Sequence, residues 1–265
     1  MGPKSRLGKF GQFVGVPHNA IDHRTADPRQ LAMLEEKNPR RRRLLYGRRK
    51  GPKLSARQSR LRAALLPQVT LNLKEGRDPE GYFAQAVSDV WFEVGYGAGE
   101  HLLWQAAANP TVGFLAAEPY VSGTAKLLSR LDAKDLPNVR LYEDDARDII
   151  AALPDACIGR FFILFPDPWP KTRHHKRRFI QSDTLDEIAR ILKPGAELRF
   201  ATDDPGYLGY ALERLLAHLA FRWTAEGPSD WKSRPTDWPQ TRYEVKELHG
   251  PPAFLRFVRT GKVDP

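Results

Sequence analysis

Short apolar runs alternate with amphipathic stretches of helical period from Asp89 onward. The predicted strands are Val90–Val94, Val112–Ala117, Val139–Tyr142, Phe161–Phe165, Leu198–Thr202 and Ala253–Val258. The predicted helices are Arg57–Leu66, His101–Ala108, Val121–Leu131, Thr184–Leu192 and Tyr207–Leu219, with Thr184 and Glu187 at capping-box spacing. Because regular alternation of strands and helices gives a parallel sheet with helices on both faces, the pattern predicts a doubly wound, mostly parallel α/β fold.

The run Phe161–Phe165 is unbroken by polar residues and continues directly into Pro166-Asp167-Pro168. Such a run is typical of a strand buried on both faces, and open α/β sheets bind their ligands at the carboxyl ends of the strands. The two prolines fix φ and remove backbone donors, so the direction of the Asp167 carboxylate is set before a ligand arrives. We therefore expect Asp167 to be a functional acid.

The residues after Asp167 carry dense positive charge. The cations are Lys171, Arg173, Lys176, Arg177 and Arg178, interleaved with His174 and His175. A packed core does not accept this much charge, so a polyanion is the expected partner, and Trp169 offers a ring on which a nucleobase could stack. For the cations alone, a solvated loop is an equally good interpretation. No metal is expected, because the two adjacent histidines cannot share a helix face and lie among cations.

A glycine-rich loop, Glu93-Val94-Gly95-Tyr96-Gly97-Ala98-Gly99, follows the first predicted strand and opens a helix. Glycines let the backbone approach a ligand closely. Glu100 stands where a dinucleotide fingerprint has its third glycine, and its charge would face a pyrophosphate, so nicotinamide and flavin cofactors are disfavoured. S-adenosyl-L-methionine has no phosphate and carries a positive sulfonium, which suits a loop flanked by Glu93.

Two further acids follow predicted strands. Glu118 comes after the second strand, where a carboxylate can accept hydrogen bonds from both ribose hydroxyls, and Asp145 comes after the third, where it could contact an adenine amino group. The alternative is that both are solvated loop acids, which their regular placement disfavours. His101 is expected to be a helix-surface residue or a satisfied polar contact rather than a catalyst.

Composition and charge bound the remaining possibilities. The 265 residues suffice for one large α/β domain and an appendage, and the net charge of +10 favours nucleic acid as a partner. Residues 1–56 are rich in Arg and Lys and lack an apolar period, so we expect a flexible basic arm before a domain at 57–265. Two interpretations of the arm stay open: it binds RNA, or it is a tail without function. A single cysteine and the absence of a long apolar window or signal peptide lead us to expect a cytoplasmic protein without a membrane span.

Four motifs resemble the bacterial tRNA (guanine-N7-)-methyltransferase family, which belongs to the class I S-adenosylmethionine-dependent methyltransferases. The motifs are the loop Glu93–Gly99, the Pro-Asp-Pro-Trp signature within Phe165–Arg178, Ala201-Thr202-Asp203, and Thr241-Arg242-Tyr243-Glu244. The resemblance runs from about Arg57 to Arg259. Tyr96 stands where Phe is frequent, and Arg242-Tyr243 replaces Lys-Phe, which keeps the charge and the ring.

The resemblance implies a class I methyltransferase fold and methyl transfer to N7 of guanosine 46 in the tRNA variable loop. It implies that the cofactor contacts are Glu93, Gly95, Gly97, Gly99, Glu118, Asp145 and Asp167, with Asp167 at the catalytic position. It implies that the substrate contacts are Lys171, Arg173, His174, His175, Lys176, Arg177, Arg178, Asp203, Thr241, Arg242, Tyr243 and Glu244. We expect tRNA as the partner, no obligate protein partner, and a monomer or homodimer.

The chemistry of N7 methylation agrees with these assignments. N7 of guanine is an exposed lone pair, so attack on a sulfonium methyl requires positioning rather than a general base. The purine becomes cationic, and Asp167, Asp203 or Glu244 could stabilise that charge. Two alternatives are the same chemistry on another nucleic acid, which the Pro-Asp-Pro-Trp element disfavours, and a non-catalytic RNA-binding protein, which the complete set of acids disfavours.

Overall fold

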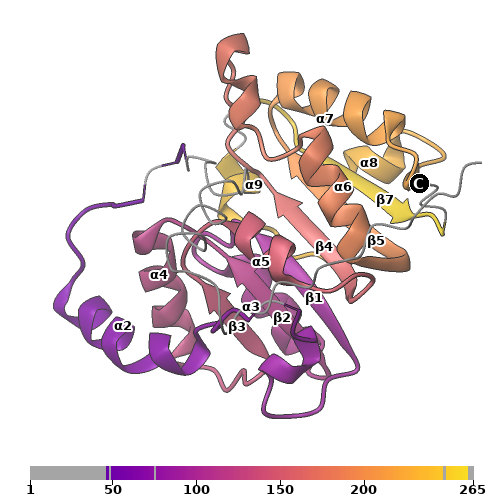
Figure 1. Cartoon of the computed structure of the whole chain (residues 1–265). Helices are drawn as coiled ribbons and strands as arrows, with labels where there is room; N and C mark the ends of the chain where they lie inside the picture. Colours follow the sequence, from indigo (N-terminus) through magenta and orange to yellow (C-terminus); the bar gives the residue numbers. More distant parts are fainter. Residues whose placement is uncertain (1–45, 48, 75, 247–248, 262–265) are drawn as a thin grey trace, which may run out of the picture. The chain divides into compact units, whose positions relative to one another are not determined.

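The described part of the chain forms a seven-stranded sheet in the order β3-β2-β1-β4-β5-β7-β6 (Figure 1). The strands are β1 (Asp89–Val94), β2 (Val112–Ala117), β3 (Val139–Tyr142), β4 (Ile158–Leu164), β5 (Leu192–Thr202), β6 (Phe221–Trp223) and β7 (Ala253–Arg259). This computed structural model describes residues 46–47, 49–74, 76–246 and 249–261. Most of the predicted arm, residues 1–45 and 48, lies outside the described residues.

Strand direction confirms the predicted doubly wound, mostly parallel α/β sheet. β1 pairs in parallel with β2 and β4, β2 with β3, and β4 with β5. β7 is antiparallel to both β5 and β6. The chain order therefore reverses between β1 and β4, and such switch points are where open α/β sheets bind ligands, outside the carboxyl ends of the strands.

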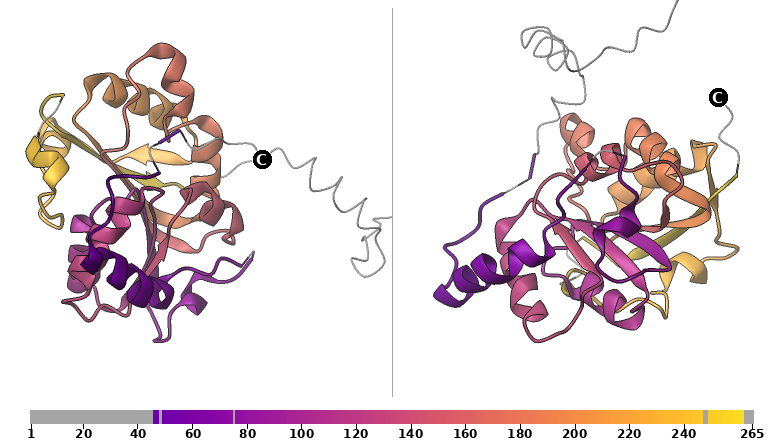
Figure 2. Two further views of the ribbon diagram at one scale, coloured as in Figure 1. Left: turned by 90° about the vertical axis from the view of Figure 1, so that its left-hand side faces the viewer. Right: turned by 60° about the horizontal axis from the view of Figure 1, so that its bottom comes forward.

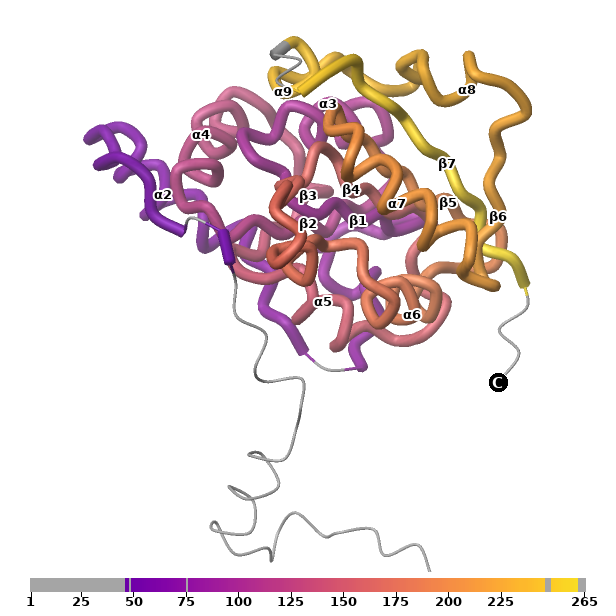
Figure 3. Tube along the Cα trace, turned by 90° about the horizontal axis from the view of Figure 1, so that it is seen from above, coloured from indigo at the N-terminus to yellow at the C-terminus, as the bar shows by residue number. Residues whose placement is uncertain are grey.

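The helices form a layer on each face of the sheet. They are α2 (Ala56–Val69), α3 (Glu100–Ala108), α4 (Val121–Leu131), α5 (Ala146–Ala152), α6 (Ser182–Ile191), α7 (Pro205–Ala217), α8 (Ser229–Lys232) and α9 (Arg242–Lys246), with 3-10 turns η2 (Pro79–Tyr82) and η3 (Thr172–Arg177). Figure 3 shows α3 and α4 on one side of the strands and α5 and α6 on the other. α2 packs against α4 (Figure 2). None of the described helices is both long enough and apolar enough to cross a bilayer.

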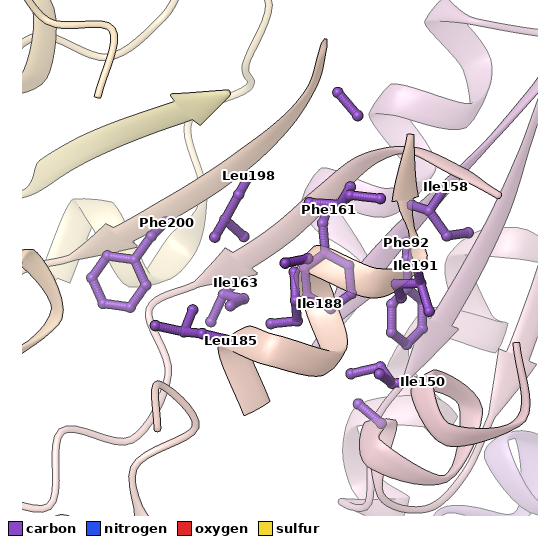
Figure 4. Close-up of a cluster of buried hydrophobic side chains, with 14 of the residues drawn as sticks. Phe92, Ile150, Ile158, Phe161, Ile163, Leu185, Ile188, Ile191, Leu198 and Phe200 are labelled. Carbon is purple, nitrogen blue, oxygen red and sulfur yellow. The ribbon is translucent and has the colours of Figure 1, made fainter. Parts of the chain in front are cut away.

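The larger apolar core lies between the sheet and the layer formed by α5, α6 and α7. Figure 4 shows Leu185 and Ile188 of α6 lying against Phe161 and Ile163 of β4, and all four side chains are fully buried or nearly so. Burial of an aliphatic or aromatic side chain of this kind stabilises the fold by about 1.5–3 kcal/mol. A second core joins α3 and α4 to β2 and β3. Phe162 of β4 is 1% exposed and packs against His101 of α3, so β4 is covered on both faces, as its apolar sequence predicts.

The start of α6 differs from its prediction. Thr184 is buried inside the helix, and the N-cap is Gln181, which makes no side-chain capping bond, so the predicted capping box of Thr184 and Glu187 is wrong. The Gln181 amide instead donates to the main-chain oxygens of His175 and Arg178, at 2.7 and 3.2 Å. These bonds fix the first turn of α6 to the basic turn before it.

Candidate active site

The glycine loop lies at the carboxyl end of β1 and requires its glycines. Gly95, Gly97 and Gly99 have φ of 74°, 52° and 75°, in the left-handed region that favours glycine. A Cβ on Gly99 would lie 2.6 Å from Leu127 of α4, and one on Gly123 of α4 would lie 2.7 Å from the Gly97 oxygen. The loop and α4 are therefore in direct backbone contact.

Glu118 closes this loop from the neighbouring strand end. Its Oε2 accepts the Gly97 N–H and its Oε1 accepts the Tyr120 N–H, both at 2.9 Å. Burial raises the pKa of the Glu118 carboxyl, and the negative charges of Asp167 and Glu93 raise it further. The structure thus brings three predicted acids together at the switch point, where their field favours a cation.

Glu93 is buried and paired. Its Oε2 lies 2.7 Å from Nδ1 of His101, and Nε2 of His101 lies 3.2 Å from Nε2 of Gln105. His101 is only 3% exposed. Of the two alternatives given above for His101, the structure supports the satisfied polar contact and not the helix surface. Its i,i+4 spacing to Gln105 could have pointed to a shared buried face.

Asp145 lies at the end of β3 and begins α5. Its Oδ1 accepts the Arg147 N–H at 3.0 Å as a helix N-cap, and its Oδ2 lies 3.2 Å from the Arg147 guanidinium. The carboxylate is buried. Its contact with adenine stays a prediction. In that contact the same carboxylate would both cap α5 and bind adenine.

Asp167 lies on a turn that is held at both ends. Phe165 and Trp169 have φ of 49° and 43°, which costs about 1–3 kcal/mol for each such residue and is typical of functional sites. The Phe165 N–H donates to the Ala201 oxygen at 2.8 Å, and the Arg178 Nε donates to the Pro168 oxygen at 2.7 Å. The Asp167 carboxyl lies on the surface of the turn, and partial desolvation raises its pKa above the ordinary value.

Arg178 is the buried member of the basic run. It is 1% exposed, with its guanidinium packed against the rings of Tyr207 and Tyr210 at 4.9 and 4.5 Å. Together with its bond to Pro168, this burial makes Arg178 a support of the Asp167 turn. The contact between Arg178 and RNA stays a prediction, and it would require the guanidinium to leave this packing.

The rest of the basic run lies in and beside η3. Lys171, Arg173 and Lys176 are exposed. The Arg177 guanidinium lies 4.6 Å from the Tyr46 ring and 4.9 Å from the Trp169 ring, so one face of Trp169 is in contact with a cation. Partial desolvation and the neighbouring cations, first among them Arg177, lower the pKa of His174.

His175 packs edge-on against Tyr210, with ring centroids 5.5 Å apart. Within the described ranges, no group of three or more His, Cys, Asp or Glu side chains could hold a metal ion. His174 lies edge-on to Trp169, with ring centroids 6.0 Å apart, and its Nε2 accepts from Arg173 Nε at 3.4 Å.

The predicted substrate segment reaches the glycine loop. The Arg242 N–H donates to Glu100 Oε2 at 2.8 Å, and the Tyr243 ring lies 3.5 Å from the position that a Cβ on Gly97 would take. Glu244 is buried, with Oε1 2.9 Å from Arg234 Nε. Tyr243 therefore faces the loop, while Glu244 is turned inward.

Two further predicted substrate residues have partners within the chain. The Thr241 hydroxyl accepts the Glu244 N–H at 3.3 Å, which begins the short helix α9. The Asp203 carboxylate, directly after β5, accepts the His249 N–H at 3.3 Å. Asp203 thus joins the end of β5 to the segment that precedes β7.

Glu100 is a site residue that sequence reasoning missed. Its Oε1 accepts from Arg130 at 2.8 Å, and Arg130 also donates to the Ala98 oxygen at 2.7 Å. With its second oxygen on Arg242, Glu100 connects the glycine loop, α4 and α9. Nothing in the sequence signals this, because the two partners lie far from Glu100 along the chain.

Comparison with known proteins gives consistent results. Residues 88–250 match a family model described as a putative methyltransferase. A tRNA (guanine-N(7)-)-methyltransferase of Rhodospirillum rubrum is 50% identical over 221 residues, 81% of this chain and 87% of that protein. Proteins of the same name from a Ruegeria species and from Brucella abortus are 45% and 42% identical, over 81% and 86% of this chain and 87% and 100% of their own lengths.

Proposed function

The chain belongs to the tRNA (guanine-N(7)-)-methyltransferases, and from this premise we propose that it transfers the methyl group of S-adenosyl-L-methionine to N7 of guanosine 46 in the tRNA variable loop. The observation that carries the proposal is the cluster of Glu93, Glu118 and Asp167 around the glycine loop, with the exposed cations of η3 beside it. The acids suit a positively charged donor, and the cations suit RNA.

The residues at the switch point fit this cofactor. Each Glu118 oxygen accepts one main-chain N–H, which leaves lone pairs for ribose hydroxyls. The charges of Asp167 and Glu93 act on Glu118, and three carboxylates in this arrangement would repel a pyrophosphate and attract a sulfonium. We propose that Glu93, Glu118 and Asp145 hold the cofactor, with the bare backbone of Gly95, Gly97 and Gly99 against it.

When bound, S-adenosyl-L-methionine supplies an electrophilic methyl group. The chain's own residues then have to orient guanine and stabilise charge, because N7 has no proton to remove. We assign the stabilisation of the developing purine cation to Asp167, whose turn is held by the bonds to Phe165 and Pro168. A preorganised carboxylate of this kind acts without reorganising during the reaction.

We assign RNA binding to the exposed face of η3 and to α9. Lys171, Arg173 and Lys176 are free to contact phosphates, and Tyr243, 44% exposed, lies over the glycine loop where a splayed guanine could stack. The other proposed substrate contacts are His174, His175, Arg177, Arg178, Asp203, Thr241, Arg242 and Glu244. We propose that the enzyme acts in the cytoplasm as a monomer or homodimer, without an obligate partner protein.

Methylation of defined transcripts tests the proposal. The full chain is incubated with labelled S-adenosyl-L-methionine and an unmodified tRNA carrying G46, with the A46 transcript as a matched control and ribosomal RNA as a competing substrate. We expect 7-methylguanosine in the G46 digest and none in the A46 digest. Label in both tRNAs would contradict the assignment to position 46, and label in ribosomal RNA alone would support the alternative nucleic-acid substrate.

A further inference from the structure

A buried chain of hydrogen bonds runs from Glu93 toward the segment before α9. Glu93 contacts Nδ1 of His101, and Nε2 of His101 contacts the Gln105 amide nitrogen. That nitrogen also donates to the main-chain oxygen of Asp237 at 2.8 Å. His101 and Gln105 are 3% and 2% exposed, so water does not compete for these contacts.

The contact with Asp237, at one end of this series of hydrogen bonds, fixes the positions of the protons. The Asp237 main-chain oxygen can only accept, so the Gln105 amide must present its nitrogen there, as the structure has it. The Gln105 Oε1 then accepts from Asn109 at 3.2 Å, which agrees with this orientation. Because the amide nitrogen is only a donor, the His101 Nε2 that faces it must be an acceptor without a proton.

The ring proton of His101 is therefore on Nδ1, where it donates to Glu93 Oε2. The imidazole cannot rotate away from this arrangement, because its ring lies among Phe162 and Trp238, with ring centroids at 4.7 and 5.6 Å. Oε2 of Glu93 is thus held by His101, which leaves Oε1 as the oxygen available to a ligand.

We propose that His101 is a positioning residue of the cofactor site, present as the neutral tautomer protonated at Nδ1 and set in that form by Gln105. This role rests on the proposed function in so far as Glu93 holds S-adenosyl-L-methionine. It adds a residue on the opposite side of Glu93 from the ligand, and it extends the site to the Asp237 main chain.

Binding measurements on matched variants test the role. His101→Asn keeps a side-chain N–H at about the position of Nδ1, whereas His101→Leu removes it. We expect His101→Leu to weaken S-adenosyl-L-methionine binding by about 10- to 100-fold, the range for a lost hydrogen bond to a charged group, and His101→Asn to recover most of that loss. His218→Asn is the control, since His218 contacts Asp186 at 3.1 Å on other helices and should leave the affinity unchanged.

The tautomer has its own readout. In a long-range proton–nitrogen NMR spectrum of the full chain, the His101 signals, identified by their loss in His101→Asn, should show a protonated Nδ1 and an unprotonated Nε2. Gln105→Leu should remove that preference. A proton on Nε2 of the wild-type ring would overturn the tautomer, whether or not the chain binds the cofactor.

Titration calorimetry distinguishes a failure of the positioning role of His101 from a failure of the proposed function. Wild-type affinity of His101→Leu, in a chain that binds S-adenosyl-L-methionine, would overturn the positioning role and leave the proposed function intact. No binding by the wild-type chain would overturn the cofactor assignment itself, and with it the role of His101.

Discussion

At the scale of single residues, Asp167 lies on a constrained turn. Its turn has two residues with left-handed φ and is bonded at both ends. If its negative charge stabilises the developing purine cation, Asp167→Asn should lower the single-turnover methylation rate by about 10²-fold or more, with a much smaller effect on cofactor affinity. Rapid-quench assays with saturating tRNA measure the rate.

The pH dependence separates charge stabilisation from proton transfer. The pKa of Asp167 is raised, so the wild-type rate should fall as pH drops through that pKa and the carboxylate becomes neutral. Asp167→Asn should lack this acid limb and show no new ionisation between about pH 6 and 9, the range of a tuned general base. A rate defect that varies across this range would support proton transfer instead.

Glu118 joins the glycine loop to the neighbouring strand end. Glu118→Ala removes a carboxylate from the proposed ribose contact and leaves the Gly97 N–H without its acceptor. We expect the affinity for S-adenosyl-L-methionine to fall by about 1.5–3 kcal/mol, measured by titration calorimetry. The exposed Glu80 of η2 provides a control, and Glu80→Ala should bind normally. Equal affinities of the two variants would remove Glu118 from the cofactor site.

At the scale of elements, the contact between α4 and the glycine loop decides the effect of a glycine substitution. Alanine in place of glycine inside a helix normally stabilises by about 0.5–1 kcal/mol. At Gly123 the new Cβ would lie 2.7 Å from the Gly97 oxygen, so Gly123→Ala should destabilise the protein and weaken cofactor binding.

Gly209 of α7 is the matched control. A Cβ on Gly209 meets nothing within 4 Å, so Gly209→Ala should raise the free energy of unfolding by about 0.5–1 kcal/mol. Urea unfolding of both variants gives the comparison. Stabilisation by Gly123→Ala as large as that by Gly209→Ala would show that the loop and α4 are not in close contact.

The elements themselves were predictable where the apolar pattern was complete. The predicted bounds of β2, β3 and α4 equal the observed ones, because the apolar residues that are buried in each element recur from its beginning to its end. β5 begins at Leu192, but it was predicted only from Leu198 because Lys193-Pro194-Gly195 interrupts the apolar run. β6 has three residues and is too short to show alternation.

The site was predictable to the extent that its residues follow strands. Glu118 and Asp167 come directly after parallel strands, so the topology brings them to one edge of the sheet. The contacts of Glu100 with Arg242 and of Gln105 with Asp237 arise only when α9 and the segment before it pack onto α3. The burial of Arg178 was not predictable, because sequence does not show which cations of a basic run are buried.

At the scale of the whole molecule, the net charge of +10 favours RNA binding in general. We expect the exposed cations in and beside η3 to contribute a part of the tRNA affinity that the rest of the charge does not replace. Replacing Lys171, Arg173 and Lys176 together by Ala should weaken tRNA binding. It should also reduce the slope of log K against log salt by roughly 0.7–0.9 for each phosphate that these cations neutralise in the wild-type complex. Fluorescence anisotropy at a series of salt concentrations measures both quantities.

A charge-matched control separates this surface from net charge. Replacing the exposed Lys134, Arg222 and Lys232 by Ala removes the same charge from other elements. This control should retain most of the slope. If the two triple variants show equal reductions in affinity and slope, the η3 cations act only through the total charge of the protein.

The position of β7 has a consequence for synthesis on the ribosome. β7 is the last strand of the described residues, yet it lies between β5 and β6. Strands β1 to β4 can pair in the order in which they are made, whereas the free edge of β5 gains its partner only after residue 259 has left the ribosome. An uncovered strand edge is a template for pairing with other chains. Nascent chains on a polysome therefore carry an open β5 edge beside Asp203 until β7 inserts, and ribosomes stalled before Ala253 would hold that edge exposed to their neighbours.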